Sequence, residues 1–141
     1  MGPGLGSAPH FLSLQDLAAE VAIAWVYGRS AGRLAAAEIP AGTQKTTRRE
    51  DVLDDASIKA VIVLTPASTI LQIVQGVARA GKQVLIEKPR ETDLHRANAL
   101  VEACEVCGVT QALMLPHRLH ESALGLAALI NTGELGELVS A

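Results

Sequence analysis

A lysine stands where a buried strand is expected to end, because the run Val84-Leu85-Ile86 leads directly into Glu87-Lys88-Pro89. Open α/β sheets bind their ligands at the carboxyl ends of their strands. Proline lacks an N–H and forces a turn directly after the lysine. Lys88 is therefore the candidate catalytic residue: partly desolvated beside Glu87, it could hydrogen-bond a substrate hydroxyl or carbonyl and transfer a proton. The alternative is an ordinary solvated lysine.

The amino-terminal run Gly2-Pro3-Gly4-Leu5-Gly6-Ser7 is typical of the phosphate-binding loop of dinucleotide-binding folds. The best register places Gly2, Gly4 and Ser7 at the three small positions. Gly4 would let the backbone approach a pyrophosphate, and the following helix would offer free N–H groups. A single glycine motif is a weak signal, so a flexible terminus is the alternative.

The segment after the second expected strand bears on the choice of cofactor. NAD-binding folds usually carry a carboxylate there for the ribose hydroxyls. This chain instead has Arg29, Ser30 and, one turn later, Arg33. Guanidinium groups pair well with phosphate, so these residues favour NADP over NAD. The alternative is a solvated helix start with surface arginines.

Other residues follow expected strands at the same edge of the sheet. Thr65-Pro66 closes an apolar run, and its hydroxyl and backbone could contact the cofactor; a plain turn is the alternative. Glu87 could orient Lys88 or reach the nicotinamide ribose. Arg118, with His117, could line the same crevice or cap the following helix. His117 and His120 lack a third ligand at suitable spacing, so no metal site is expected.

The composition limits the class of protein. The chain has 141 residues, enough for one domain, with 49% hydrophobic and 19% charged residues, as in globular proteins. A net charge of −3 argues against nucleic acid as a partner. No long apolar run or signal peptide is visible, so a soluble cytoplasmic protein is expected. Cys104 and Cys107 are interpreted as packed, reduced thiols rather than as a redox or zinc pair.

Periodicity predicts an alternation of strands and helices. The expected strands are residues 21–27, 44–47, 60–65, 84–87 and 110–115, with a further strand beginning at 138–140. The expected helices are residues 7–20, 31–38, 50–55, 69–80, 93–107 and 121–131. This alternation implies parallel strands joined by right-handed crossovers, hence an α/β fold with a doubly wound, Rossmann-type sheet.

Taken together, these motifs resemble the Gfo/Idh/MocA family of oxidoreductases. The resemblance spans nearly the whole chain: the glycine loop with His10 beyond it, VIVLTP, and the stretch from Leu115-Pro116-His117-Arg118 through GELGEL. Its specific part is the AGK-x-VL-x-EKP block at residues 80–89. Asn and His, frequent after Thr-Pro in the family, are replaced here by Ala67 and Ile70.

The resemblance implies hydride transfer between NAD(P) and a carbinol or carbonyl carbon of a small-molecule substrate, often a sugar or cyclitol. In such enzymes the lysine that matches Lys88 contacts the substrate and the nicotinamide ribose, and the Lys-Pro peptide is cis in some members. The whole enzyme is expected to be a homo-oligomer. A non-catalytic dinucleotide-binding module or an inactive truncated fragment is the alternative.

The resemblance also predicts the domain organisation. Residues 1–136 would form the NAD(P)-binding domain without its first strand, and residues 137–141 would begin an α/β substrate domain that is not present. Loss of the first strand would leave the edges of residues 21–27 and 60–65 unpaired. The fragment by itself is then expected not to turn over.

Overall fold

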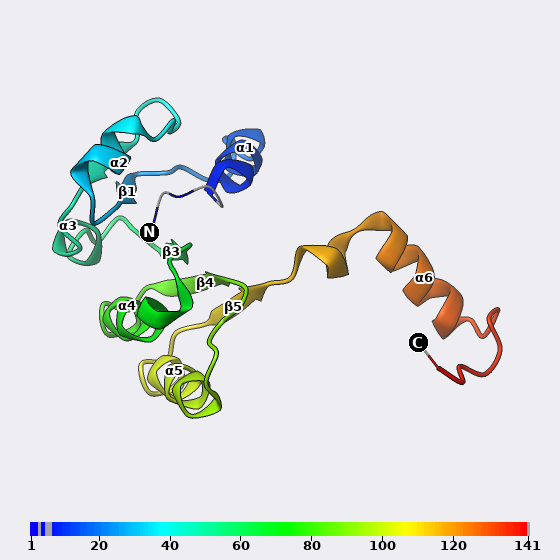
Figure 1. Cartoon of the computed structure of the whole chain (residues 1–141). Helices are drawn as coiled ribbons and strands as arrows, with labels where there is room; N and C mark the ends of the chain where they lie inside the picture. Colours follow the sequence, from blue (N-terminus) through cyan, green and yellow to red (C-terminus); the bar gives the residue numbers. More distant parts are fainter. Residues whose placement is uncertain (3, 5–6, 141) are drawn as a thin grey trace.

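The computed structural model describes residues 1–2, 4 and 7–140, in which strands and helices alternate along the chain (Figure 1). The strands are β1 Trp25–Tyr27, β2 Gln44–Thr46, β3 Ala60–Val63, β4 Gln83–Glu87 and β5 Gln111–Met114. The helices are α1 Ala8–Asp16, α2 Ala31–Ala36, α3 Glu50–Leu53, α4 Ala67–Arg79, α5 Leu94–Val106, the 3-10 helix η2 Pro116–Leu119, and α6 Glu121–Asn131.

Every strand pairing in the described part of the chain is parallel, which confirms the predicted α/β class. The strands lie in two sheets, one of order β1-β2 and one of order β3-β4-β5. In the larger sheet Val61 lies opposite Val84, and Val84 opposite Gln111. Parallel strands place their carboxyl ends at one edge, so the segments that follow β3 and β4 meet there.

Met1 and Gly2 join the two sheets. The amino group of Met1 donates to the carbonyl of Ile62, and the N–H of Leu64 donates to the carbonyl of Met1 over 2.9 Å. On the other side, the N–H of Gly2 donates to the carbonyl of Tyr27, also over 2.9 Å. The expectation that both strand edges would be unpaired is therefore wrong at their carboxyl ends.

The core lies on one face of the larger sheet, beneath α4. The buried residues of this helix, Ile70, Ile73, Val74 and Val77, recur with the 3.6-residue period of an α-helix and so form one apolar face. Val63 and Ile86 project onto it from β3 and β4 and are fully buried. Fully burying one such side chain contributes about 1.5–3 kcal/mol, so this cluster is the main source of stability.

Several element boundaries differ from the sequence prediction. The run at residues 21–27 forms a strand only at Trp25–Tyr27, because β2 offers just three residues for pairing. Helix α1 ends at Asp16 instead of residue 20 and buries no residue. Leu94, although apolar and at the start of α5, is 78% exposed. No strand forms at residues 138–140, which have no neighbouring strand.

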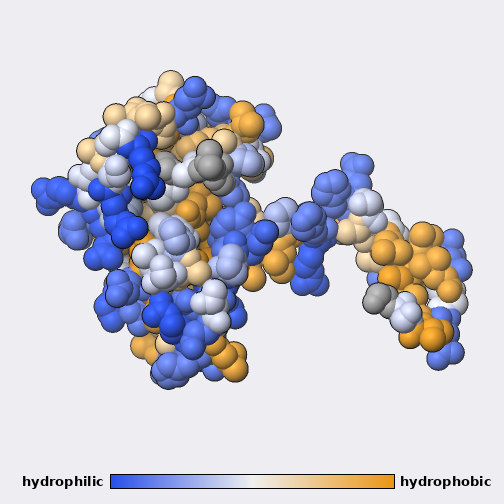
Figure 2. Space-filling view, in the orientation of Figure 1, coloured by the Kyte–Doolittle hydropathy of each residue, from blue (hydrophilic) through white to orange (hydrophobic). Residues whose placement is uncertain are grey.

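Helix α6 stands away from the rest of the molecule, beyond η2 (Figure 1). None of its residues is buried, and Figure 2 shows a continuous apolar surface over this part of the chain. Leu124, Leu126 and Leu129 are among the exposed side chains. Within the described residues, no helix has both the length and the apolar character needed to cross a membrane.

Candidate functional site

A groove of about 800 Å³ lies at the carboxyl ends of β1, β3 and β4. This volume is in the range of cofactor and small-molecule sites. The groove forms because Gly28, Leu64 and Glu87 end or follow three parallel strands at the same edge. It brings together most of the predicted site residues: Gly2, Gly4, Arg29, Ser30, Arg33, Thr65, Pro66, Glu87 and Lys88.

The first glycine of the loop is required by the backbone. Gly2 has φ of +90°, and a Cβ at this position would lie 2.7 Å from Cγ2 of Thr65 and 3.0 Å from the carbonyl oxygen of Leu64. Any side chain would therefore be strained and would collide with the end of β3. A Cβ on Gly4 would meet nothing within 4 Å, so the backbone there faces open space. That space is where a ligand can approach closely.

Thr65, which lines the groove, carries an unsatisfied polar group. Its Oγ1 is buried and has no hydrogen-bond partner among the described residues. A buried hydroxyl without a partner costs free energy, and a polar ligand atom would remove that cost. Together with the open space at Gly4, this hydroxyl fits a polar ligand such as a dinucleotide.

The charge in the groove is strongly positive. Four of its lining residues carry cations, namely Arg29, Arg33, Arg49 and Lys88, whereas Glu87 is the one lining carboxylate in the described residues. The exposed side chains of Arg29 and Arg33 can reorient toward a ligand. Ser30 caps α2, since its hydroxyl accepts the N–H of Arg33 at 3.4 Å. This arrangement favours an anionic ligand.

Glu87 joins Lys88 to α1. One carboxylate oxygen accepts the backbone N–H of Lys88 at 2.6 Å, and the other lies 3.6 Å from Nε2 of His10. The Lys88–Pro89 peptide is cis, as the family resemblance implied. The side chain of Lys88 itself is exposed, so the expected desolvation of its amine is not present in this structure.

Two predicted residues lie elsewhere. The hydroxyl of Ser7 donates to the carbonyl of Gly4 over 2.7 Å, which closes the glycine loop on itself, and Ser7 is buried outside the groove. Arg118 lies exposed in η2 and is not among the residues that line the groove. The two histidines near it do not belong to a metal cluster, since the described residues contain no group of three suitable ligands.

Sequence reasoning missed two residues of the site. Arg49, the residue just before α3, lines the groove, and no local motif signals this. His10 was given no role in the site beyond marking the resemblance, although its side chain is only 12% exposed and faces Glu87. A helical position one turn after a glycine loop could have suggested contact with the neighbouring strand end, but the partner is 77 residues away.

Comparison with known proteins agrees with this geometry. Residues 1–114 match the GFO_IDH_MocA family model, described as an oxidoreductase family with an NAD-binding Rossmann fold. The chain is 32% identical over 87 residues to scyllo-inositol 2-dehydrogenase (NAD(+)) of Bacillus subtilis, a match covering 62% of the chain and 25% of that protein. It is 39% identical over 80 residues to D-xylose 1-dehydrogenase (NADP(+)) of Haloarcula marismortui, covering 55% and 22%.

A solved structure shares the fold. The WlbA dehydrogenase of Bordetella pertussis, in complex with NADH and UDP-GlcNAcA, superimposes with a TM-score of 0.88 at 24% identity. The match covers 96% of the chain and 39% of that dehydrogenase. The chain therefore spans well under half the length of the proteins it resembles.

Proposed function

The chain belongs to the Gfo/Idh/MocA family of oxidoreductases, and we propose that it is the nucleotide-binding part of an enzyme acting on a sugar or cyclitol. In this proposal the whole enzyme transfers hydride between a nicotinamide cofactor and a carbinol or carbonyl carbon. The substrate class rests on the dehydrogenases of inositol and xylose to which the chain is similar. Residues 1–136 would be the cofactor domain, and residues 137–141 would begin the substrate domain.

The observation that carries the proposal is the meeting of three separate motifs in one positively charged groove. Gly2 and Gly4, Thr65, and the Glu87-Lys88 pair come from distant parts of the sequence and line the same 800 Å³ space. The unpaired Thr65 hydroxyl and the open backbone at Gly4 fit a ligand with many polar groups. If these segments were only surface turns, nothing would require an unpaired hydroxyl, an open backbone and clustered cations to line one space.

The groove residues have distinct roles in this proposal. Backbone at Gly4 would hold the pyrophosphate, which gains from close approach to peptide N–H groups. The bound nicotinamide would supply the acceptor or donor of the hydride. Lys88 would bind the substrate oxygen and exchange its proton, since its ammonium can donate and its amine can accept. Glu87 would hold the backbone at Lys88, through the 2.6 Å hydrogen bond, while this happens.

We further propose that NADP(H) is preferred over NAD(H). Arg29 and Arg33 line the groove beyond β1, and Arg49 adds a third guanidinium there. A 2′-phosphate would be paired by such groups, whereas a bare ribose is usually held by a carboxylate at this place. Glu87 is the lining carboxylate among the described residues, and it is hydrogen-bonded to Lys88 at the end of β4.

Titration calorimetry of the chain with NADPH and NADH tests this assignment. Arg29→Ala should weaken NADPH binding by about tenfold, close to 1.4 kcal/mol for one charge-assisted contact, and change NADH binding by less than about twofold. Arg79→Ala is the matched control, because Arg79 is exposed at the end of α4 and does not line the groove. Equal loss of NADPH affinity in both variants, or no preference in the unmodified chain, would refute the NADP assignment.

A further inference from the structure

An ion pair lies directly behind the side of the positively charged groove that carries Lys88. Glu91, three residues beyond Lys88, pairs with Arg96 in the first turn of α5. Nε of Arg96 lies 3.1 Å from Oε1 of Glu91, and Nη2 donates to Oε2 at 3.4 Å. The guanidinium thus contacts both carboxylate oxygens, an arrangement that fixes the direction of both side chains. Neither residue is among those that line the groove.

The carboxylate of Glu91 is withdrawn from water. Its side chain is 1% exposed, whereas Glu87 and Asp51, which form the other ion pairs of the described residues, have side chains 28% and 32% exposed. The N–H of Thr92 donates to Oε1 of Glu91 at 3.4 Å, so the buried charge has a partner besides Arg96. Burying an ion pair stabilises a fold little, because the lost hydration offsets the attraction. Fixing the geometry of the chain is the better attested use of such a pair.

Arg96 also contacts a second element that lines the groove. Its Nη2 donates to the carbonyl of Ser68 at 3.3 Å, in the first turn of α4. The residues on both sides of Ser68 line the groove, as does Pro89, two residues before Glu91. One guanidinium therefore connects the segment after β4 to the start of α4, and it does so from outside the groove.

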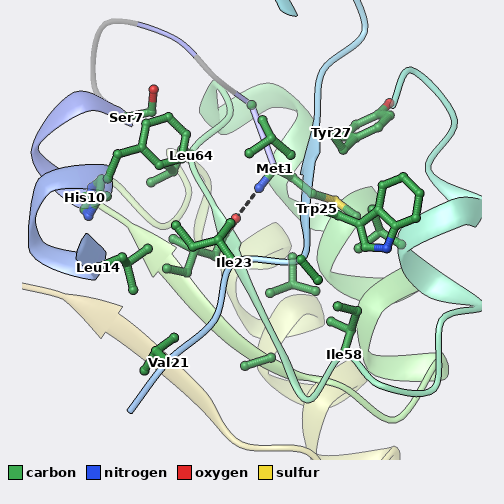
Figure 3. A pocket seen from close by; sticks show the side chains of 18 of the residues that line it. Met1, Ser7, His10, Leu14, Val21, Ile23, Trp25, Tyr27, Ile58 and Leu64 are labelled. Atoms are coloured by element: carbon green, nitrogen blue, oxygen red, sulfur yellow. Dashed lines mark hydrogen bonds between the residues drawn. The ribbon is translucent and has the colours of Figure 1, made fainter. Parts of the chain in front are cut away.

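The segment that carries Lys88 is consequently held at both ends. On its amino-terminal side, Glu87 is the last residue of β4 and pairs with β5. Its carboxylate lies 3.6 Å from His10, which lines an apolar hollow beside α1 (Figure 3). On the carboxyl-terminal side, Glu91 is held by Arg96. Three residues separate Glu87 from Glu91, a span too short for the backbone of Lys88 to move far.

We propose that Glu91 and Arg96 are positioning residues, which fix the backbone of Lys88 relative to the start of α4. The consequence for catalysis rests on the proposed function, in which Lys88 meets the substrate oxygen. A displacement of about 1 Å, caused by a change far from the reacting atoms, is enough to slow a reaction about 100-fold. The ion pair prevents such a displacement without touching the substrate or the cofactor.

The choice of variant follows from the burial of the pair. Replacing only one partner would leave the other charge without its counterion, which destabilises a fold strongly. The informative variant is therefore Glu91→Leu, Arg96→Met, which removes both charges and keeps a similar volume. Such apolar replacements of buried pairs often leave stability unchanged or raise it. The matched control is Glu102→Leu, Arg79→Met, which removes the same two kinds of charge from exposed positions of α5 and α4 outside the groove.

Amide hydrogen exchange of the chain, followed by NMR, tests the positioning without any catalysis. The N–H of Lys88 donates to the carboxylate of Glu87 at 2.6 Å. In the double variant it should exchange at least about fivefold faster, because the segment is then anchored at one end only. The N–H of Val84, bonded to Thr110 within the sheet, should keep its rate. The control variant should leave both rates unchanged.

Steady-state kinetics tests the consequence, in a form of the enzyme that turns over inositol or D-xylose with NADP⁺. The double variant should lower kcat by at least about tenfold. It should change the KM for NADP⁺ by less than about twofold, because the glycine loop and the arginines of the groove are unaltered. A merely structural pair would lower the thermal unfolding midpoint without changing kcat at a temperature where the protein is folded.

Arg96→Lys provides a second test, which stays valid if the double variant does not fold. It keeps both charges, but a lysine lacks the planar fork of donors that contacts both oxygens of Glu91 and the carbonyl of Ser68. The changes should have the same sign and be smaller, with exchange at Lys88 about twofold faster and kcat about threefold lower.

Two results would overturn the proposal. One is an exchange rate at Lys88 that is the same in the folded double variant and in the control variant. The other is an unchanged kcat in a double variant whose Lys88 exchanges faster. Absence of NADPH binding and of turnover in the unmodified enzyme would refute the proposed function instead, and the exchange rates would still decide whether the ion pair positions Lys88.

Discussion

Lys88 is placed by its backbone at the groove proposed to bind the cofactor, which we call the cofactor groove, while its side chain remains exposed. Glu87 accepts the N–H of Lys88, and His10 lies on the other side of the same carboxylate. The backbone of Lys88 is thus held by the end of β4 and, through Glu87, by α1. Its ammonium can still move within the groove. A side chain that exchanges a proton needs a fixed backbone and a mobile end group, because the end group must reach the substrate oxygen in a defined position.

In a form of the enzyme that turns over, we expect Lys88→Ala to lower kcat by about 100-fold or more. Cofactor affinity should change by less than about threefold, because the groove keeps the glycine loop and its arginines. Steady-state kinetics with calorimetry measures both values. Lys59→Ala is the control, since Lys59 is exposed and does not line the groove. Near-normal kcat in Lys88→Ala would mean that Lys88 is only a surface charge.

At the scale of elements, the described contacts that hold the two sheets together include one buried amino group. The Met1 amine bonds the carbonyl of Ile62 and is shielded from water, and this burial lowers its pKa from 8.0 to about 5. A second link comes from Trp25, whose indole Nε1 donates to the carboxylate of Asp55 at 2.8 Å. Hydrogen bonds to Ser57 and Trp25 hold the pKa of Asp55 down, at about 2. The first link ties the amino terminus to β3, and the second ties β1 to the segment leading into β3.

The buried Met1 amine makes stability depend on pH. Between about pH 5 and 8 the unfolded chain binds a proton at Met1 that the folded chain excludes. The free energy of unfolding should therefore rise with pH across this window, by up to about 4 kcal/mol for a shift of three units. Below about pH 5 this contribution is constant, because both states are protonated. Urea unfolding at several pH values, on protein that retains Met1, measures the effect.

Acetylation of the Met1 amine supplies the comparison. The acetylated chain has no proton to bind at this position, so its stability should vary less between pH 5 and 8 than that of the unmodified chain. All other groups are the same in both proteins, so their effect on stability cancels in the difference. Identical pH dependence of the two forms would show that the Met1 amine is solvated in the folded chain.

At the scale of the whole molecule, α6 contributes little to the folded body. It buries none of its residues and makes its contacts mainly with η2, while the core beneath α4 is complete without it. Its apolar surface, with Leu124, Leu129 and Ile130 exposed, is larger than single scattered side chains would give (Figure 2). Exposed apolar surface of this kind promotes association.

We expect removal of residues 116–141 to change the thermal unfolding midpoint by less than about 3 °C. The reason is that the lost burial contributes less than about 0.5 kcal/mol to the free energy of unfolding. The shortened chain should also remain monomeric to higher concentration. Circular dichroism on heating and sedimentation measure the two effects. As a control, Leu100→Ala should lower stability by about 2–5 kcal/mol, because Leu100 is fully buried in the core. A large loss of stability in the shortened chain would place α6 in the cooperative unit.

The sequence alone determined the elements and most of the cofactor groove. The periodicity of α4 and the apolar runs of β3 and β4 are local, so spacing and residue type are enough to predict them. Parallel strands then bring their carboxyl ends together whatever the loops between them. This is why Thr65, Arg29 and Lys88, far apart in the chain, could be assigned to one groove.

Only the tertiary structure decided the rest. Ser7 was predicted from the glycine spacing, but its hydroxyl turns inward to the carbonyl of Gly4. Arg49 lines the groove although no local motif marks it, and His10 of α1 meets Glu87 at the end of β4, 77 residues further along the chain. The division into two sheets, with Met1 bridging them, likewise depends on which backbone groups find partners. Pairing across dozens of residues is fixed by packing and by hydrogen-bond satisfaction, which local spacing does not encode.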